Sequence, residues 1–194
     1  MLVACLGDSI TAGSPYWDPD PVVRARIDRA LDERSQWQWW AGRKDTSVTF
    51  RNCGIFGQRT DEIAARLEEA AAGADVLIVQ GGINDIAQGR SVETAAANLL
   101  AMVRRGKKLG LPVAVADVLP WNNGYSKTDG PIRDLNARIA ALAVTEGVLL
   151  LAFFATLEDP ERPGRMREEW TSDGSHPSVE GYRRLGELAF ELPA

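Results

Sequence analysis

Five short apolar runs, separated by longer segments with helical spacing, constrain the fold of this chain more strongly than any other feature of its 194 residues. The runs have the length of β-strands and cover residues 2–6, 48–53, 76–79, 113–116 and 148–151. Regular alternation of strands and helices predicts a parallel sheet with helices on both faces. Four runs are apolar throughout, as strands buried on both faces should be. The run at 48–53 alternates instead, which predicts a strand at an edge of the sheet.

The segments between the runs carry the apolar spacing of amphipathic helices. The spaced residues are Ile63, Leu67 and Ala70; Val92, Ala96, Leu99 and Val103; Ile132, Leu135, Ile139 and Leu142; and Tyr182, Leu185 and Ala189. Residues typical of helix ends mark the boundaries. Ser91 can cap the second of these helices, Pro131 fits the first position of the third, and Gly147 can end it.

The sequence predicts one domain over residues 1–194, because no repeat, low-complexity tract or long flexible linker divides it. Its least regular stretch, at about 14–47, holds four of the six tryptophans. We expect this Trp-rich stretch to be an insertion between the first two strands, formed by a loop and one helix at about 21–34.

The composition is that of an ordinary globular protein, with 45% hydrophobic and 25% charged residues. A net charge of −5 and interleaved acidic and basic residues leave no basic stripe for nucleic acid. No apolar run approaches the ~20 residues of a membrane span, and the N-terminus lacks the pattern of a signal peptide, so a cytoplasmic location is expected. Cys5 and Cys53 match no metal or redox spacing and are expected to be small buried apolar side chains, with pairing between them left open.

Glycines and polar residues collect where the predicted strands end. In an open parallel sheet, ligands bind in the crevice beyond the carboxyl ends of the strands. Those positions hold Gly7-Asp8-Ser9-Ile10-Thr11, Asn52-Cys53-Gly54 and Gly81-Gly82-Ile83-Asn84-Asp85, and the chain later closes with Asp173-Gly174-Ser175-His176-Pro177. A functional site is therefore expected at this edge of the sheet.

Ser9 would lie on the turn from the first strand into a helix, where a serine can be a plain N-cap or an activated nucleophile. Activation needs a base, and His176 is the only histidine in the chain. Asp173, three residues earlier, is spaced to accept from the Nδ1–H of His176 and so fix its tautomer. The three residues predict a catalytic triad for acyl transfer.

Three groups at neighbouring strand ends are candidates for an oxyanion hole. They are the backbone N–H of Ser9, the backbone N–H of Gly54 and the side-chain amide of Asn84. Gly54 is chosen because the absence of a side chain lets its N–H approach a substrate oxygen. Each residue alone is ordinary in a turn, but their occurrence together favours the stabilisation of a tetrahedral intermediate.

These residues fall into four blocks that resemble those of the SGNH hydrolases, also called the GDSL family of esterases and lipases. The blocks are Gly7-Asp8-Ser9-Ile10, Gly54 within Asn52-Cys53-Gly54-Ile55-Phe56-Gly57, Gly82-Ile83-Asn84-Asp85 and Asp173-Gly174-Ser175-His176. The likeness spans residues 2 to about 185, and Ile10 in place of the usual leucine leaves the nucleophile untouched. The resemblance implies a three-layer α/β/α, flavodoxin-like fold with a five-stranded parallel sheet in the order 2-1-3-4-5. It also implies acyl transfer through an acyl-enzyme without a metal or organic cofactor.

The sequence does not determine the substrate. A short-chain carboxylesterase acting on a small-molecule ester is the first expectation, since the chain is compact and shows no dedicated lid. A carbohydrate O-deacetylase is the second, and a thioesterase or lysophospholipase the third. Asp8, Trp121 and Asn122 are candidate substrate contacts, the last two because they follow the fourth strand.

Two alternatives to a serine esterase are a metal-dependent phosphatase and a non-catalytic binding module. Acidic residues at the strand ends, Asp8, Asp85 and Asp117, suggest a magnesium-dependent phosphatase, but the family blocks already account for the first two. A non-catalytic flavodoxin-like binding module would use the Gly-Asp-Ser-Ile-Thr turn to hold a phosphate, and the presence of Asn84 and His176 argues against it. The sequence does not predict an oligomeric state.

Overall fold

Five parallel strands form the central sheet in the order β2-β1-β3-β4-β5. The structure, a computed structural model, describes residues 1–193. The strands are β1 (Leu2–Gly7), β2 (Thr49–Gly54), β3 (Val76–Val79), β4 (Val113–Ala116) and β5 (Leu149–Leu151). The observed order confirms the predicted sheet, with the alternating strand β2 at an edge. Strand β1 is therefore flanked by β2 on one side and by β3 on the other.

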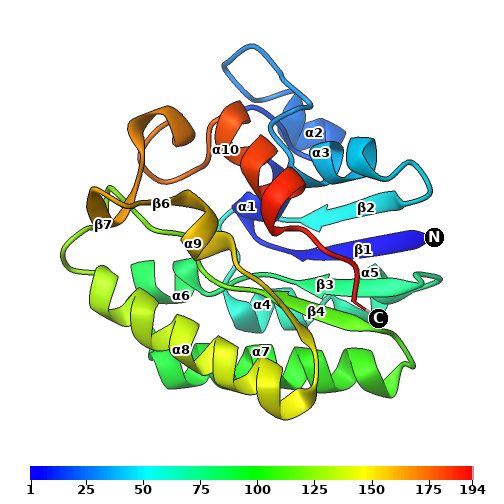
Figure 1. Cartoon of the computed structure of the whole chain (residues 1–194). Coiled ribbons are helices and arrows are strands. Elements are labelled where there is room, and N and C mark those ends of the chain that lie inside the picture. The colour runs from blue at the N-terminus through cyan, green and yellow to red at the C-terminus, as the bar shows by residue number, and fades with distance from the viewer. Residues whose placement is uncertain (194) are drawn as a thin grey trace.

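One face of the sheet is covered by four helices (Figure 1). They are α4 (Thr60–Ala64), α5 (Leu67–Ala71), α7 (Val92–Lys108) and α8 (Asp129–Glu146). Ser91 caps α7 through a bond from Thr94 N–H to its Oγ, and Gly147 ends α8 in the left-handed conformation, as predicted. Helix α8 begins at Asp129, so Pro131 is its third residue and not its first. The first turn tolerates this because its N–H groups have no intrahelical acceptor.

The other face is covered by the short helices α1 (Ser9–Ala12), α3 (Trp37–Lys44), α9 (Phe153–Leu157) and α10 (Val179–Arg184). A π-helical segment, η2 (Leu185–Ala189), continues α10. Trp37 is fully buried at the centre of this layer, with its ring centroid 5.9 Å from that of Phe50 and 5.7 Å from that of Phe153. This tryptophan packs the insertion onto the sheet.

The insertion differs from its predicted form. Instead of one helix at about 21–34, it contains a single helical turn, α2 (Pro21–Arg24), followed by turns and then α3. Val22 and Leu31 are 57% and 50% exposed, so the apolar side chains of this segment are not packed against the rest of the protein. Helices in proteins owe most of their stability to such burial, and this segment lacks it.

The structure adds elements that the sequence did not predict. A two-stranded antiparallel ribbon, β6 (Glu158–Asp159) with β7 (Arg162–Met166), and a 3₁₀ turn, η1 (Glu168–Trp170), lie between β5 and α10. Cys5 and Cys53 are free thiols that belong to the cores on opposite faces of the sheet. Within residues 1–193 no helix is long and apolar enough to cross a membrane.

Candidate active site

Ser9 begins helix α1 directly after the carboxyl end of β1. Asp8 is the N-cap of this helix, and its Oδ1 accepts from the Ile10 N–H at 2.9 Å. The helix ends after one turn because Gly13 adopts a left-handed φ of 105°. Ser9 is thus held on a sharp strand-to-helix turn. Its own N–H has no acceptor among the described residues.

His176 lies 167 positions further along the chain, and the fold brings it to Ser9. The distance from His176 Nε2 to Ser9 Oγ is 3.1 Å, and that from Nδ1 to Asp173 Oδ2 is 2.9 Å. The other carboxylate oxygen of Asp173 accepts from the N–H groups of Ser175 at 2.9 Å and His176 at 2.8 Å. The structure therefore places the three predicted residues in one continuous chain of hydrogen bonds. In such a chain, the imidazole can take the hydroxyl proton of the serine.

Asp173 remains ionised in this arrangement. Burial alone would raise its pKa, but the hydrogen bond from the His176 ring and those from the backbone N–H groups of His176 and Ser175 outweigh it and lower the pKa below the usual value. A carboxylate at this position favours the proton on Nδ1 of His176. The lone pair of Nε2 is then directed at Ser9 Oγ.

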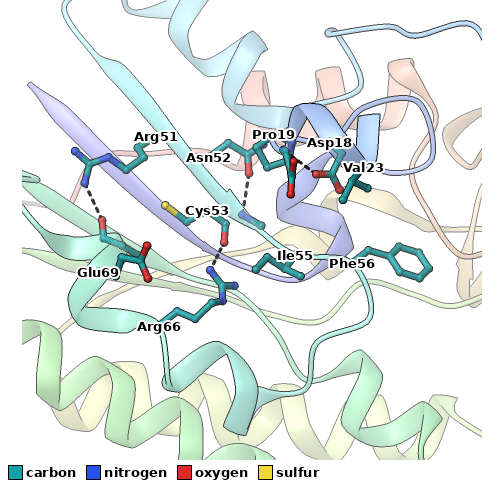
Figure 2. Close-up of a pocket in the computed structure, with 13 residues that line it drawn as sticks. Asp18, Pro19, Val23, Arg51, Asn52, Cys53, Ile55, Phe56, Arg66 and Glu69 are labelled. Carbon is teal, nitrogen blue, oxygen red and sulfur yellow. Dashed lines mark hydrogen bonds between the residues drawn. The ribbon is translucent and has the colours of Figure 1, made fainter. Parts of the chain in front are cut away.

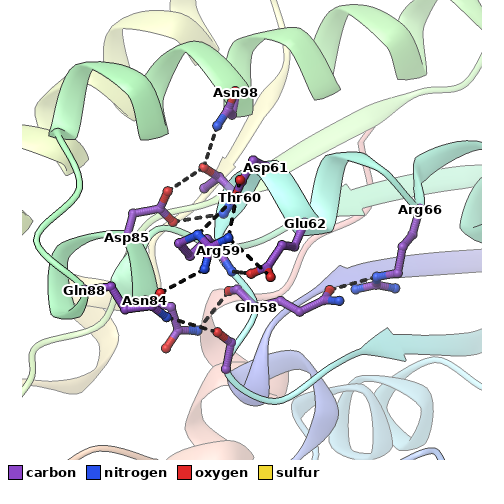
Figure 3. Close-up of polar contacts among 11 residues, drawn as sticks. Gln58, Arg59, Thr60, Asp61, Glu62, Arg66, Asn84, Asp85, Gln88 and Asn98 are labelled. Carbon is purple, nitrogen blue, oxygen red and sulfur yellow. Dashed lines mark hydrogen bonds and ion pairs between the residues drawn. The ribbon is translucent and has the colours of Figure 1, made fainter.

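Asn84 lies in helix α6 (Ile83–Ala87), which follows β3. Its Nδ2 donates to the Gln58 carbonyl at 2.9 Å, so one amide hydrogen is used and the other is available (Figure 3). The neighbouring Asp85 is buried and accepts from both the N–H and the hydroxyl of Thr60, at 2.9 and 2.8 Å. These bonds fasten the loop between β2 and α4 to α6.

Gly54 does not present its N–H as expected. That N–H donates to Asn52 Oδ1 at 2.9 Å, and Gly54 is buried against α1, where a Cβ would collide with the backbone of Ala12. The glycine is thus required for the packing of β2 against α1. This overturns the reason for choosing it as an oxyanion donor.

Gly57, three residues further, was not among the predicted oxyanion donors. It has a left-handed φ of 77°, and its N–H has no acceptor among the described residues. The preceding Phe56 has its ring centroid 6.0 Å from that of His176, which places this loop over the triad. The sequence did contain this second candidate, because Gly57 is the last residue of the block Asn52-Cys53-Gly54-Ile55-Phe56-Gly57.

A model of the GDSL-like lipase/acylhydrolase family matches residues 5–184, nearly the whole chain. The chain belongs to this family. The match confirms the resemblance drawn from the four blocks, and the hydrolysis of acyl groups is the activity that the family implies. A comparison with curated protein sequences gave no match.

Solved structures of low sequence identity share the fold of this acylhydrolase. A member of the lipolytic protein G-D-S-L family from Veillonella parvula is 20% identical, with a TM-score of 0.76 over 96% of this chain and 94% of the other. A lipase/acylhydrolase from Enterococcus faecalis is 21% identical, with a TM-score of 0.74 over 96% and 92%. A protein described as an acetyl xylan esterase is 19% identical, with a TM-score of 0.73 over 96% of both chains.

Two of the three candidate substrate contacts of the acylhydrolase serve the fold instead. The Asp8 side chain is fully buried and does not reach the crevice. Asn122 uses both ends of its amide on the backbone of Met166, donating to the carbonyl at 2.9 Å and accepting from the N–H at 2.7 Å. It holds β7 in place. Trp121 lies beside the triad, where its Nε1–H donates to Ser175 Oγ at 2.8 Å.

The three acidic residues that suggested a phosphatase are also engaged within the protein. Asp8 caps α1, Asp85 binds Thr60, and Asp117 accepts from the N–H of Phe154 at 2.7 Å. Within residues 1–193, no group of three histidine, cysteine, aspartate or glutamate side chains is placed to hold a metal ion.

The buried carboxyl of Asp8 should make the stability of the protein depend on pH. Burial raises its pKa from 3.8 to about 6, and its Oδ2 has no hydrogen-bond partner among the described residues. A folded-state pKa above the unfolded value means that the folded state binds the proton more tightly. Stability is therefore lost as the pH rises from about 4 through about 6, by an amount on the order of 3 kcal/mol.

Asp8→Asn keeps the capping oxygen and removes the charge. We expect its free energy of unfolding to exceed that of the unchanged protein increasingly between pH 4 and pH 6.5, as measured by urea unfolding at each pH. Asp20→Asn makes the same change at the exposed N-cap of α2 and is the control. If the difference in unfolding free energy between Asp8→Asn and the unchanged protein does not vary with pH, the raised pKa of Asp8 is contradicted.

Proposed function

We propose that this acylhydrolase cleaves carboxylic esters of short acyl chains through an acyl-enzyme on Ser9. The observation that carries the proposal is the unbroken chain from Asp173 through His176 to Ser9, with distances of 2.9 and 3.1 Å. Both distances lie within the range needed for proton transfer. Family membership supports the same class of reaction.

The first step forms the acyl-enzyme. His176 Nε2 accepts the Ser9 proton while Oγ bonds to the ester carbonyl carbon, and the carbonyl electron pair moves onto its oxygen. When this tetrahedral intermediate collapses, the bond to the alcohol oxygen breaks and that oxygen takes the proton from His176. In the second step, water gives a proton to His176 and attacks the acyl carbon. The acid then leaves, and Ser9 recovers its proton.

Three donors are proposed to hold the negative oxygen: the N–H of Ser9, the N–H of Gly57 and the Nδ2–H of Asn84 that does not bind Gln58. The first two have no other acceptor among the described residues. All three groups are fixed before substrate binds, so little reorganisation is needed as charge develops.

Asn84→Ala should lower kcat by about 10²–10³-fold with a much smaller change in KM, because the bond is strongest in the transition state. Steady-state hydrolysis of p-nitrophenyl acetate measures both constants. Asn98→Ala is the control, since this amide belongs to the same network but donates to Thr60 Oγ1 (Figure 3). Equal losses of kcat in the two variants would point to a disturbed loop and argue against an oxyanion role.

Covalent labelling tests the proposed nucleophile directly. A fluorophosphonate should add one label to the purified protein, and peptide mass spectrometry should find it on Ser9. Hydrolysis of p-nitrophenyl acetate should stop in proportion to labelling. A protein that neither reacts with the probe nor hydrolyses esters would be better described as a binding module.

A carbohydrate O-deacetylase is the second candidate. It is supported by the likeness of the fold to that of a protein described as an acetyl xylan esterase. Release of acetate from acetylated xylan, compared with that from simple acetates, separates this candidate from the first.

A further inference from the structure

Asp173 and His176 stand on one loop, residues 171–177, whose shape is fixed from within. The His176 carbonyl accepts from the Thr171 hydroxyl at 2.8 Å and from the Ser172 N–H at 3.0 Å. Together with the bonds that the Asp173 carboxylate accepts, these hold Asp173 against His176. All of them join residues of the same loop, so none sets the distance from the loop to the nucleophile.

Asn123, in the loop that follows β4, binds this loop from outside at three points. Its Nδ2 donates to the Asp173 carbonyl at 2.7 Å and to Ser175 Oγ at 2.9 Å, so both amide hydrogens are used on the loop. Its backbone N–H donates to the Gly174 carbonyl at 3.0 Å. These bonds reach the residues that lie directly before His176 in the chain.

Trp121 supplies a further bond, from its Nε1–H to Ser175 Oγ at 2.8 Å. The ring also packs closely beside Ser175, since the space that they line with Ile10 is only about 10 Å³. Within the part of the chain that the structure describes, the hydrogen bonds of residues 172–176 that leave the loop 171–177 go only to Trp121, Asn123 and Ser9.

The loop after β4 is itself firmly anchored. The Asn136 side chain, on α8, accepts from the Val118 N–H at 2.8 Å and donates to the Val118 carbonyl at 2.9 Å. The Asn122 amide binds the backbone of Met166 at both ends. Trp121 therefore lies between two fastened residues, and Asn123 follows directly, so both can act as a fixed support.

On the β2 side, the loop 171–177 has a weaker neighbour. A cavity of about 680 Å³ lies along β2 (Figure 2), and a second of about 240 Å³ shares Phe56 with it. No residue of 171–177 lines either cavity. The Phe56 ring is 6.0 Å from that of His176 between centroids, but Phe56 is 62% exposed. An exposed ring that borders open space restrains the imidazole less than directed hydrogen bonds do.

We propose that Trp121 and Asn123 are positioning residues, which hold the loop 171–177 at the distance from Ser9 that proton transfer needs. Both act through Ser175 and the backbone of the loop. Proton transfer from Oγ to Nε2 requires a hydrogen-bond distance, and a displacement of ~1 Å can lower a rate by about 10²-fold. The proposal rests on the acyl transfer proposed above and specifies which residues set its geometry.

Asn123→Ala should lower kcat for p-nitrophenyl acetate by at least about tenfold with little change in KM, because proton transfer is impaired and ester binding is not. Asn122→Ala is the matched control, since it removes the same side chain from the neighbouring position, whose amide binds Met166. It should leave kcat close to that of the unchanged protein. Thermal unfolding curves show whether the two variants are equally stable.

The kinetic result has two contrary outcomes. Equal kcat values in Asn123→Ala and Asn122→Ala would overturn the proposal. A raised KM with unchanged kcat in Asn123→Ala would also overturn it, because Asn123 would then be a substrate contact.

Two further measurements separate a displaced loop from an unfolded one. The rate constant for fluorophosphonate labelling of Ser9 should fall in Asn123→Ala as kcat does, because both reactions need the Ser9 proton to be removed. His176 is the only histidine, so its Nδ1–H gives a single imidazole resonance in proton NMR. That resonance should persist in Asn123→Ala, since bonds within the loop keep Asp173 against His176. Its disappearance would mean that the loop had lost its own structure and would contradict a positioning role.

A double-mutant cycle tests the contribution of Trp121. Trp121→Phe removes the Nε1–H and keeps an aromatic ring, so kcat should fall by about fivefold. In a Ser175→Ala background the acceptor is already gone, and Trp121→Phe should have no further effect. Equal losses in the two backgrounds would show that Trp121 does not act through Ser175.

The outcomes distinguish this proposal from the proposed function. If the unchanged protein is not labelled on Ser9 and hydrolyses no ester, the proposed function is wrong. If the unchanged protein is active and Asn123→Ala is labelled and turns over at the same rates, only the positioning role is wrong.

Discussion

Replacing Ser9 by alanine should reduce kcat for ester hydrolysis by on the order of 10⁶-fold, because the oxygen that forms the acyl-enzyme is lost. The remaining rate would come from the oxyanion donors and from binding alone. The substitution removes one hydroxyl whose contact is the imidazole of His176, while the backbone of α1 stays capped by Asp8. The fold should therefore survive. Hydrolysis of p-nitrophenyl acetate and a thermal unfolding curve measure the two effects.

Ser35→Ala is the matched control for this experiment. Ser35 is also buried, but its hydroxyl has no hydrogen-bond partner among the described residues and is not joined to His176. Its loss should leave kcat close to that of the unchanged protein. Substantial turnover by purified Ser9→Ala protein, with no labelling by fluorophosphonate elsewhere, would show that Ser9 is not the nucleophile.

Asp173→Asn should lower kcat by about 10⁴-fold although the two side chains have the same shape. Asp173 Oδ1 accepts two backbone N–H groups, from Ser175 and His176, so an asparagine oxygen would take that position. Its NH₂ would then face Nδ1 of His176 and donate to it. The imidazole proton would move to Nε2, and the nitrogen next to Ser9 would no longer be a base.

The dependence of kcat on pH distinguishes this reversal of the His176 tautomer from a loosening of the loop that holds Asp173 and His176. At pH values where hydroxide can assist deprotonation of Ser9, Asp173→Asn should recover part of its lost rate. Asp173→Ala removes the acceptor for both backbone N–H groups and should also lower the unfolding temperature. A loss in Asp173→Asn that is smaller than tenfold at neutral pH would mean that the carboxylate does not set the tautomer.

The sheet could be predicted because strand formation in this chain follows from local pattern. Three of the four continuously apolar runs become the inner strands β1, β3 and β4, the fourth becomes the edge strand β5, and the alternating run becomes β2 at the opposite edge. The same logic failed in the insertion. Val22, Val23 and Leu31 remain exposed, and the helix that begins at Pro21 stops after Arg24.

The proposed oxyanion hole shows a second limit of prediction from the sequence. Gly54 and Gly57 stand in one block, and nothing local separates a glycine needed for close packing from one whose N–H is free. The difference appears only when α1 lies against Gly54 and Asn52 takes its N–H. Likewise, Asp8 and Asn122 look available for substrate until their burial and hydrogen bonds are known.

The sequence by itself determined the alternation of strands and helices, the family, and the residues of the proposed triad, because periodicity and the rarity of histidine are properties of the chain alone. Only the tertiary structure decided that His176 reaches Ser9 from 167 positions away, that the Gly57 N–H and not that of Gly54 is free, and that the large cavity lies beside β2. Distances, burial and the sharing of hydrogen bonds depend on which elements pack together, and that packing brings together segments distant in the chain.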